Sequence, residues 1–152
     1  MTPAAPEAVA AAYREAMERL LAATFATYES GDGWTARLRA ALETLLGLLA
    51  AEPATARLCF VDVLAGGPAA LEARNEATER LAGLFEPGVS EGTGAPNELL
   101  ALALAGGLSE VIYREVVAGR TAELPERLGD LLYMAVLPLR GVEAAEAALE
   151  QA

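Results

Sequence analysis

The sequence contains neither histidine nor lysine, and its only cysteine is Cys59. Histidine is the commonest general base and a principal metal ligand, so its absence removes the usual acid–base pairs and zinc sites. Without lysine there is no phosphate-binding loop of the kind that needs this residue. A single cysteine forms no disulfide within the chain, which favours a cytoplasmic location. We therefore expect a protein that is not an enzyme and holds neither a metal nor a cofactor.

Positive charge is scarce as well. Arginine supplies all 11 cationic side chains, against 22 aspartates and glutamates, and the net charge is −11. Binding to nucleic acid needs clustered cations that contact phosphates, so the chain alone should not bind DNA. No uninterrupted apolar run reaches the ~18 residues that cross a bilayer. We expect direct contact with neither nucleic acid nor membrane.

Hydrophobic residues, in contrast, make up 54% of the 152 residues, enough for a large core. A chain of this length fits one domain, here taken as residues 1–152. Apolar and polar residues do not alternate over any long stretch, and no paired runs flank an Asn-Gly turn. The sequence therefore predicts an all-α domain, a bundle of about six to seven helices.

Proline and glycine divide the first two thirds of the chain into segments with apolar residues three or four positions apart. The expected elements are a helix from Pro6 to the turn at 30–33, a helix from Trp34 to about Ala51, a short helix over 54–65, and a helix that begins at Pro68. The Gly/Pro/Ser-rich segment 86–97 follows, and we expect it to be a mobile loop.

The last two long helices, from about Asn97 to Ala118 and from about Pro125 to Leu139, are apolar on nearly every side. Such helices must be covered all round, and the simplest cover for a second face is another copy of the chain. Pro138 should end or bend the later helix near residues 134–137, before a final short helix over 142–151. The expected dimer seam consists of residues at three- and four-residue spacing on the two long helices: Leu104, Gly107, Val111, Leu128, Leu132 and Ala135.

The pair Gly106–Gly107 is unusual inside a helix. Each glycine costs ~1 kcal/mol relative to alanine, so the pair opposes helix formation by ~2 kcal/mol. Two positions without side chains allow another helix to approach closely. The alternative is that the helix breaks at this point.

Aromatic and isolated polar residues on the first, third and fifth expected helices are the candidates for a ligand pocket, because the apolar faces of these helices must meet. The candidates are Phe25, Tyr28, Phe60, Asp62, Glu110 and Tyr113. Each has a simpler interpretation: the aromatics as core residues, Asp62 as an exposed or arginine-paired acid, and Glu110 as the partner of Arg114 in a surface ion pair. Cys59 is expected to be a small core residue, not a nucleophile.

Two stretches carry a resemblance to a known family. The first, WTARLRAALETLLGLLAAEPATARLCFVDVLAGGPAALEAR, begins at Trp34, and the second, LAGGLSEVIYREVVAGRTAELPERLGDLLYMAVLPLRG, ends at Gly141. The order of the tryptophan-led helix, the acid-Pro-Ala segment, the aromatic-Val-acid-Val helix and the Gly-Pro break resembles TetR-family transcriptional regulators. The second stretch is similar to the last two helices of that family. The resemblance covers roughly residues 8–141.

This resemblance implies an effector-binding and dimerisation domain. The last two long helices would form a four-helix interface in a homodimer, and a small apolar or amphipathic effector would lie among the earlier helices. Members of the family begin with a helix-turn-helix domain, which we expect to be absent here. The alternative function is a helical protein–protein interaction or scaffolding domain without a small-molecule ligand. A closed apolar cavity of several hundred Å3 would favour the effector, and a solid core would favour scaffolding.

Overall fold

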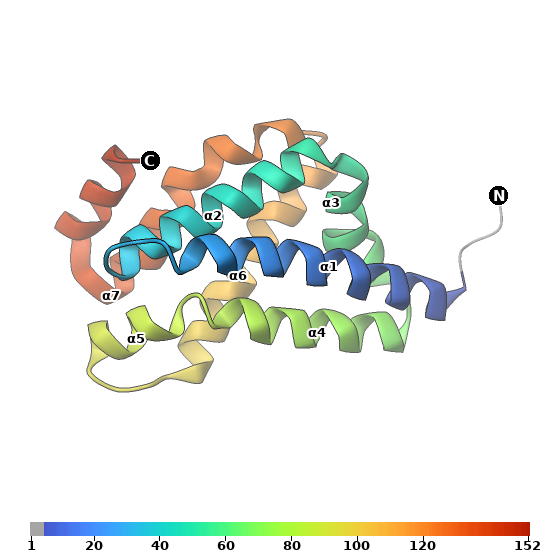
Figure 1. Ribbon diagram of the computed structural model, residues 1–152, viewed down its shortest axis with the longest axis horizontal. Helices are drawn as coiled ribbons and strands as arrows, with labels where there is room; N and C mark the ends of the chain where they lie inside the picture. Colours follow the sequence, from blue (N-terminus) through green and yellow to red (C-terminus); the bar gives the residue numbers. More distant parts are fainter. Residues whose placement is uncertain (1–4) are drawn as a thin grey trace.

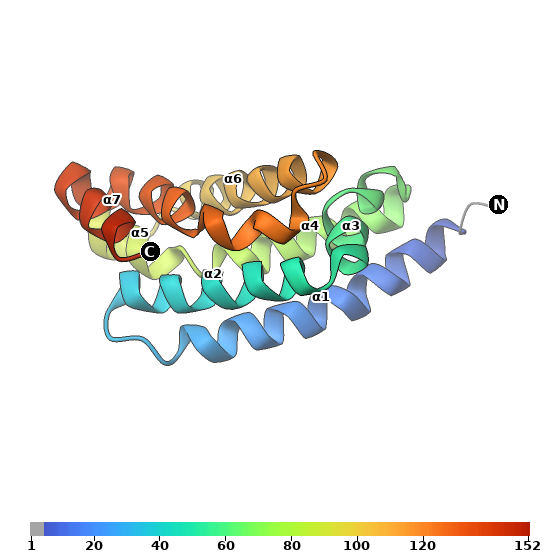
Figure 2. The same ribbon diagram turned by 90° about the horizontal axis from the view of Figure 1, so that it is seen from above.

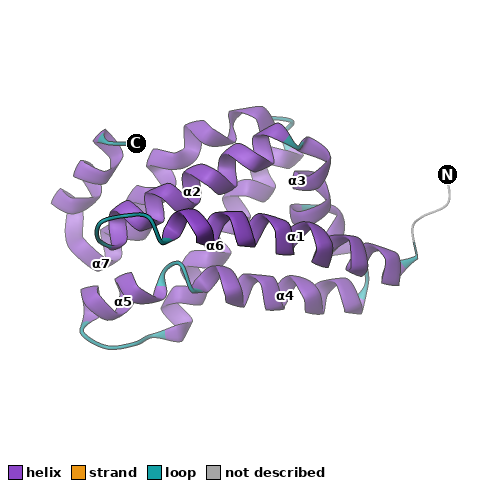
Figure 3. Ribbon diagram, viewed as in Figure 1, coloured by secondary structure: helices purple, strands orange, loops and turns teal. Residues whose placement is uncertain are grey.

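The computed structural model describes residues 5–152, and within that range the chain forms helices and no strand (Figures 1 and 3). The first four residues of the expected domain lie outside the described part. In chain order, the elements are α1 (Pro6–Tyr28), α2 (Trp34–Ala51), α3 (Pro53–Phe60), the 3-10 helix η1 (Asp62–Ala65), α4 (Pro68–Ala82), α5 (Glu86–Thr93), α6 (Glu98–Val117), the 3-10 helix η2 (Thr121–Arg127) and α7 (Leu128–Glu150). The expected all-α class is confirmed.

The helices pack in successive layers. Helices α1 and α4 run side by side along the length of the molecule (Figure 1), and they are in direct contact. Seen from above, α1 lies on one side and α6 and α7 on the other, with α2 and α4 between them (Figure 2). Helix α2 contacts α1, η2 and α7, and α4 contacts α1 and α6. One continuous cluster of buried side chains connects the layers.

Helix α2 supplies the centre of this core. Among its apolar residues at three- and four-residue spacing, Leu48 is half-buried and the others are buried, namely Trp34, Leu38, Ala41, Leu42, Leu45 and Leu49. Leu46 is buried as well, so the buried face of α2 is wider than the face expected from the three- and four-residue spacing of its apolar residues. Neighbouring elements therefore cover α2 on several sides.

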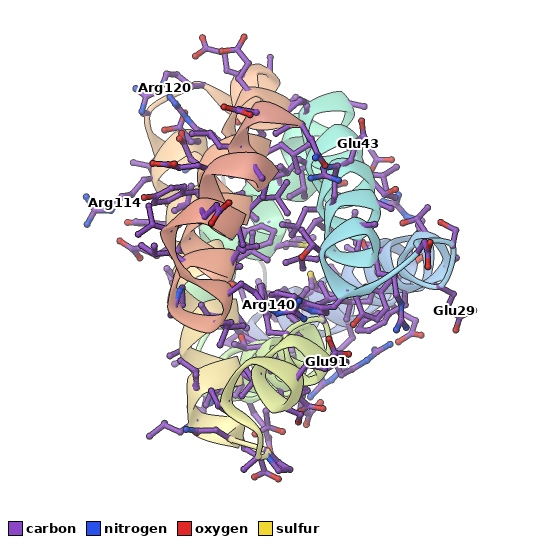
Figure 4. The ribbon with its side chains drawn as sticks, turned by 90° about the vertical axis from the view of Figure 1, so that its left-hand side faces the viewer. Glu29, Glu43, Glu91, Arg114, Arg120 and Arg140 are labelled. Atoms are coloured by element: carbon purple, nitrogen blue, oxygen red, sulfur yellow. The ribbon has the colours of Figure 1, made fainter. Side chains whose placement is uncertain are left out.

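Trp34, at the start of α2, joins segments that are far apart in the sequence. Its indole Nε1 donates a hydrogen bond of 2.9 Å to the carbonyl oxygen of Leu84. The Arg140 guanidinium lies 5.6 Å from the centre of the indole ring, and Arg140 also pairs with Glu91 at 2.6 Å (Figure 4). The backbone of Gly88 packs so closely on the indole that no side chain would fit between them. Helices α2, α5 and α7 are thus held together at one tryptophan.

The expectation that residues 86–97 form a mobile loop is wrong for most of this segment, because residues 86–93 form α5. Pro87 lies in the first turn of this helix, Val89 is completely buried, and Gly94 ends the helix in the left-handed conformation with φ 80°. Tertiary contacts, above all the close packing of α5 on Trp34, overcome the poor helix-forming composition. Only a short connection remains before Asn97, whose side chain caps α6.

The last helix also differs from its expected form. The chain passes through Pro138 as helix, and the break comes at Gly141, where φ is 84° and ψ is 177°. The α-helix begins at Leu128, not at Pro125, because residues 121–127 form η2. Gly141 can adopt this backbone conformation without the steric cost that a side chain would add, so the glycine sets the bend.

Helix α6 is continuous through Gly106 and Gly107, so the two glycines do not break it. A side chain at Gly107 would begin 3.2 Å from the sulfur of Met134 on α7 of the same chain, whereas one at Gly106 would meet open space. The close approach that the glycine pair indicated therefore occurs at Gly107, and it lies within the protomer.

Glu115 fixes the connection between α6 and α7. Its carboxylate accepts hydrogen bonds of 2.9 and 2.8 Å from Arg120, and Arg127 lies at 3.5 Å (Figure 4 labels Arg120). Hydrogen bonding to the Arg120 guanidinium holds the pKa of Glu115 below its usual range. This buried carboxylate therefore stays charged and keeps η2 against the end of α6.

The residues expected to form the dimer seam fall into two groups. Four of them are buried inside the protomer and expose little surface to a partner: Leu104, Leu128, Leu132 and Ala135. Gly107 and Val111 are half-buried. Much of the apolar surface of α6 and α7 is therefore covered by the chain itself, contrary to the expectation that a partner must cover it.

Two glycine-to-alanine substitutions test this packing. Gly88→Ala should lower the free energy of unfolding by about 1–3 kcal/mol, because the new methyl group collides with the Trp34 indole. Gly47→Ala, in α2, should raise it by about 0.5–1 kcal/mol, because open space surrounds that position and alanine is the better helix former. Urea denaturation measures both. Equal effects of the two substitutions would contradict the close contact at Trp34.

Candidate functional site

A small cavity of about 60 Å3 lies where α1, α3, α4 and α6 meet, and it is partly open to the surface beside the exposed residues Leu64 and Glu110. Figure 1 shows α1 and α4 in front of α6, with α3 at one end of them. The cavity is lined by Tyr13, Met17, Cys59, Phe60, Leu64, Arg74, Thr78, Leu81, Gly106, Ser109, Glu110 and Tyr113. It combines apolar walls with a few polar groups, as small-molecule sites do.

Two larger surface grooves adjoin this cavity. One, of about 330 Å3, lies between α4 and α6 and shares Arg74, Thr78 and Gly106 with the cavity. The other, of about 170 Å3, lies between α1 and α4 and shares Tyr13 and Met17 with it. Helix α4 borders all three spaces, so a movement of α4 would join them.

The lining residues face the cavity because of helical spacing. Arg74, Thr78 and Leu81 follow one another at intervals of four and three on α4, as do Gly106, Glu110 and Tyr113 on α6. Such residues share one face of a helix. Each helix therefore presents one stripe to the common space.

The two ionisable groups deepest in the cavity are both neutral at pH 7. Burial raises the pKa of the Tyr13 hydroxyl well above its ordinary value, and burial raises the pKa of the Cys59 thiol to about 12. Tyr13 makes no side-chain hydrogen bond within residues 5–152. Its phenol is therefore a free hydrogen-bond donor at the cavity wall.

Arg74 is the charged group at the boundary between the cavity and the α4/α6 groove. It is half-buried, and no carboxylate of residues 5–152 lies within 4 Å of it. Glu110, across the cavity on α6, is engaged instead with Arg114 at 2.8 Å. Arg74 is therefore the cation of this site that lacks a counter-charge.

Three of the six residues expected to bind a ligand come together at this cavity, namely Phe60, Glu110 and Tyr113. Phe25 and Tyr28 lie elsewhere, near the end of α1, and contact each other edge-to-face with ring centres 6.1 Å apart. There, the Arg37 guanidinium lies 4.2 Å from the centre of the Tyr28 ring. Those two aromatics therefore lie outside this cavity, and their role in ligand binding stays a prediction.

Asp62 also lies outside the cavity. It forms an ion pair of 3.4 Å with Arg57, and both side chains are about half exposed. The two residues are five positions apart, beyond the usual helical spacing, and the change from α3 to η1 brings them together. The arginine-paired surface interpretation of Asp62 is confirmed, with the partner in the preceding helix.

Sequence reasoning did not find the contribution of α4 or the polar groups Tyr13 and Arg74. The inward face of α4 is made almost entirely of alanine, at positions 70, 73, 77 and 82, which carries little periodic signal. Leu71, the first leucine of α4, is 40% exposed and so does not mark the buried face. A pattern that weighted alanine as apolar would have found the buried face of α4, with Arg74 and Thr78 at its edge.

Two further grooves, of about 360 and 280 Å3, lie beside α5 and the start of α6 and are lined mainly by exposed residues, most of them polar. No group of three or more cysteine, aspartate or glutamate side chains among residues 5–152 is arranged to hold a metal ion. Within the same range, no helix taken alone has the length and apolarity to cross a membrane, although α2 and the segment Pro53–Ala65 meet that test as a pair bent by 110°.

Comparisons with protein-family models, with curated proteins and with solved structures give no match.

The rate at which the Cys59 thiol reacts with a reagent tests how strongly the fold protects this side chain. Cys59 in the folded chain should react with an aromatic disulfide reagent at pH 8 on the order of a hundredfold more slowly than in urea, because a thiol of pKa about 12 holds almost no thiolate. Absorbance of the released thiolate measures both rates. Similar rates in the two states would contradict the burial of Cys59.

Proposed function

We propose that this chain is a TetR-like regulatory domain that binds a small apolar or amphipathic effector and works as a homodimer. The observation that carries the proposal is the convergence of α1, α3, α4 and α6 on one cavity that continues into the α4/α6 groove. The groove, at about 330 Å3, falls within the size range of small-molecule sites, about 300–1,000 Å3. The net charge of −11 supports a sensing role separate from DNA contact.

The cavity alone, at about 60 Å3, is far smaller than the about 300–1,000 Å3 of small-molecule sites. An effector therefore needs α4 to move outward. The contacts of α4 suit such a movement, because Ala70, Ala73 and Ala77 each bury little more than a methyl group. A methyl-sized group contributes ~0.8 kcal/mol, against about 1.5–3 kcal/mol for a buried leucine. Effector binding would thus select a conformation with α4 displaced.

Self-association is proposed through α6 and α7, which lie together at one side of the molecule (Figure 4). Val111, Met134 and Leu137 on these helices are only half-buried, and Val117 and Val142 are 54% exposed. Covering apolar side chains of this kind with those of a second copy would remove them from water.

The alternative function, a helical interaction domain without a ligand, is favoured by one observation. The cavity is much smaller than a typical ligand, so most of the core is solid. The two functions differ in whether a small molecule stabilises the folded chain.

A substitution at the mouth of the cavity tests effector binding. A small amphipathic compound at a hundred times its Kd should stabilise the wild-type chain by about 2.7 kcal/mol, which corresponds to a rise in Tm of roughly 5–10 °C. Gly106→Leu should abolish this rise, because its side chain enters the open space that joins the cavity and the groove. Thermal unfolding with a panel of compounds measures the effect.

The matched control is Ala103→Leu, on the exposed side of the same helix, which should retain the full rise. Native mass spectrometry of the purified chain gives a second readout, since a co-purified effector would appear as added mass. A wild-type chain that no compound stabilises, and that carries no added mass, would favour the interaction domain.

A charged residue at the proposed interface tests dimerisation. Val111→Arg should convert the dimer into a monomer, because a buried unpaired guanidinium costs several kcal/mol at an apolar interface. Leu71→Arg, on the exposed side of α4, is the control and should remain a dimer. Sedimentation velocity at micromolar concentration distinguishes the states. A monomeric wild-type chain would refute dimerisation, and a dimeric Val111→Arg variant would move the interface elsewhere.

A further inference from the structure

Arg74 differs from the arginine that lies further along the same helix. Arg80 pairs with Glu18 at 2.7 Å on the surface, as an arginine in an acidic chain is expected to do. Arg74 is half-buried and has no carboxylate within 4 Å among residues 5–152, although the chain has twice as many acidic as basic side chains. No carboxylate within these residues neutralises the Arg74 guanidinium, so an anion bound at this position would meet a positive charge that has no counter-charge of its own.

The surroundings of Arg74 offer a second donor to such an anion. The Tyr13 hydroxyl lines the same cavity, and the charge of Arg74 is close enough to act on the pKa of this phenol. Tyr13 stays protonated at pH 7 and makes no side-chain hydrogen bond within residues 5–152. Thr78, one turn after Arg74, is already engaged, since its hydroxyl donates to the Arg74 carbonyl oxygen at 2.9 Å.

The rest of the cavity is apolar. Met17, Cys59, Phe60 and Leu81 form walls beyond the two donors, and the Cys59 thiol is neutral. A ligand that fits both parts must carry charge at one end and an apolar body at the other.

The two acidic side chains that line the cavity and the α4/α6 groove, Glu110 and Glu79, form no ion pair with Arg74. Glu110 is paired with Arg114 at 2.8 Å, and Glu79 is exposed at the α4/α6 groove. Exposed glutamates keep most of their hydration, so a cationic ligand would gain less from them than an anion gains from a half-buried guanidinium.

We infer that the ligand of this site is an amphipathic anion, whose negative head lies against Arg74 and Tyr13 and whose apolar body extends toward Met17, Cys59, Phe60 and Leu81. This inference rests on the proposed effector-binding function and specifies the class of effector. The head is a carboxylate or a phosphate, since both accept two parallel hydrogen bonds from a guanidinium.

Ligands with the same chain and different heads test this inference. The probes are decanoate, decyl phosphate, decanol and decyltrimethylammonium, each below the concentration at which it forms micelles. Calorimetric titration of the full chain should give a Kd for at least one anion on the order of tenfold lower than the Kd for decanol, because a charge-assisted hydrogen bond is added. The two anionic arms show whether the head is a carboxylate or a phosphate.

The variant Arg74→Gln should lose this preference while it still binds decanol, because the apolar walls are unchanged. Arg80→Gln, on the same helix, removes one positive charge at a surface ion pair and should keep the preference. Thermal unfolding of both variants without ligand verifies that they fold.

Equal affinity for decanol and both anions, tighter binding of the cation, or an unchanged preference in Arg74→Gln would each overturn the anionic assignment and leave effector binding intact. Failure of all four probes to bind the wild-type chain would overturn this inference, and Tm measurements with the broader panel of compounds would then decide whether effector binding itself fails.

Discussion

Burial of the α2 leucines is the interaction on which the rest of the structure depends. Leu38, Leu42, Leu45, Leu46 and Leu49 lie in the middle of the core, and at about 1.5–3 kcal/mol each they contribute on the order of 10 kcal/mol. Elements from both halves of the chain cover them, including α1, η2 and α7. Trp34, at the start of the same helix, then fixes α5 and α7 by a hydrogen bond, a close glycine contact and a stacked arginine.

Against this rigid centre, α4 is held differently. Its buried face consists of alanines and a single leucine, and it borders the cavity and both adjoining grooves. Each residue of the leucine packing around α2 thus buries more apolar surface than a residue of the alanine packing under α4. The proposed effector would displace α4, because separating alanine contacts loses less hydrophobic free energy than separating leucine contacts.

Ion pairing also differs between the surface of the molecule and the cavity. On the surface, Arg19, Arg80, Arg114 and Arg140 are paired with glutamates, and Glu115 holds the connection between α6 and α7 through Arg120 and Arg127. At the cavity, Arg74 and the Tyr13 hydroxyl stay without partners among the described residues. The Arg74 guanidinium and the Tyr13 hydroxyl are therefore available to a ligand.

The sequence by itself determined α1 to α4 and where they begin, because Pro6, Pro53 and Pro68 begin helices and the α2 leucines recur at helical spacing. It also indicated Phe60, Glu110 and Tyr113, which share the cavity. Only the tertiary structure decided that residues 86–93 are helical, that Phe25, Tyr28 and Asp62 lie away from the site, and that Arg74 lies at it. The physical reason is that helical periodicity is local, whereas the rotation of an alanine-faced helix and the helicity of a Gly/Pro-rich segment are fixed by the side chains they pack against.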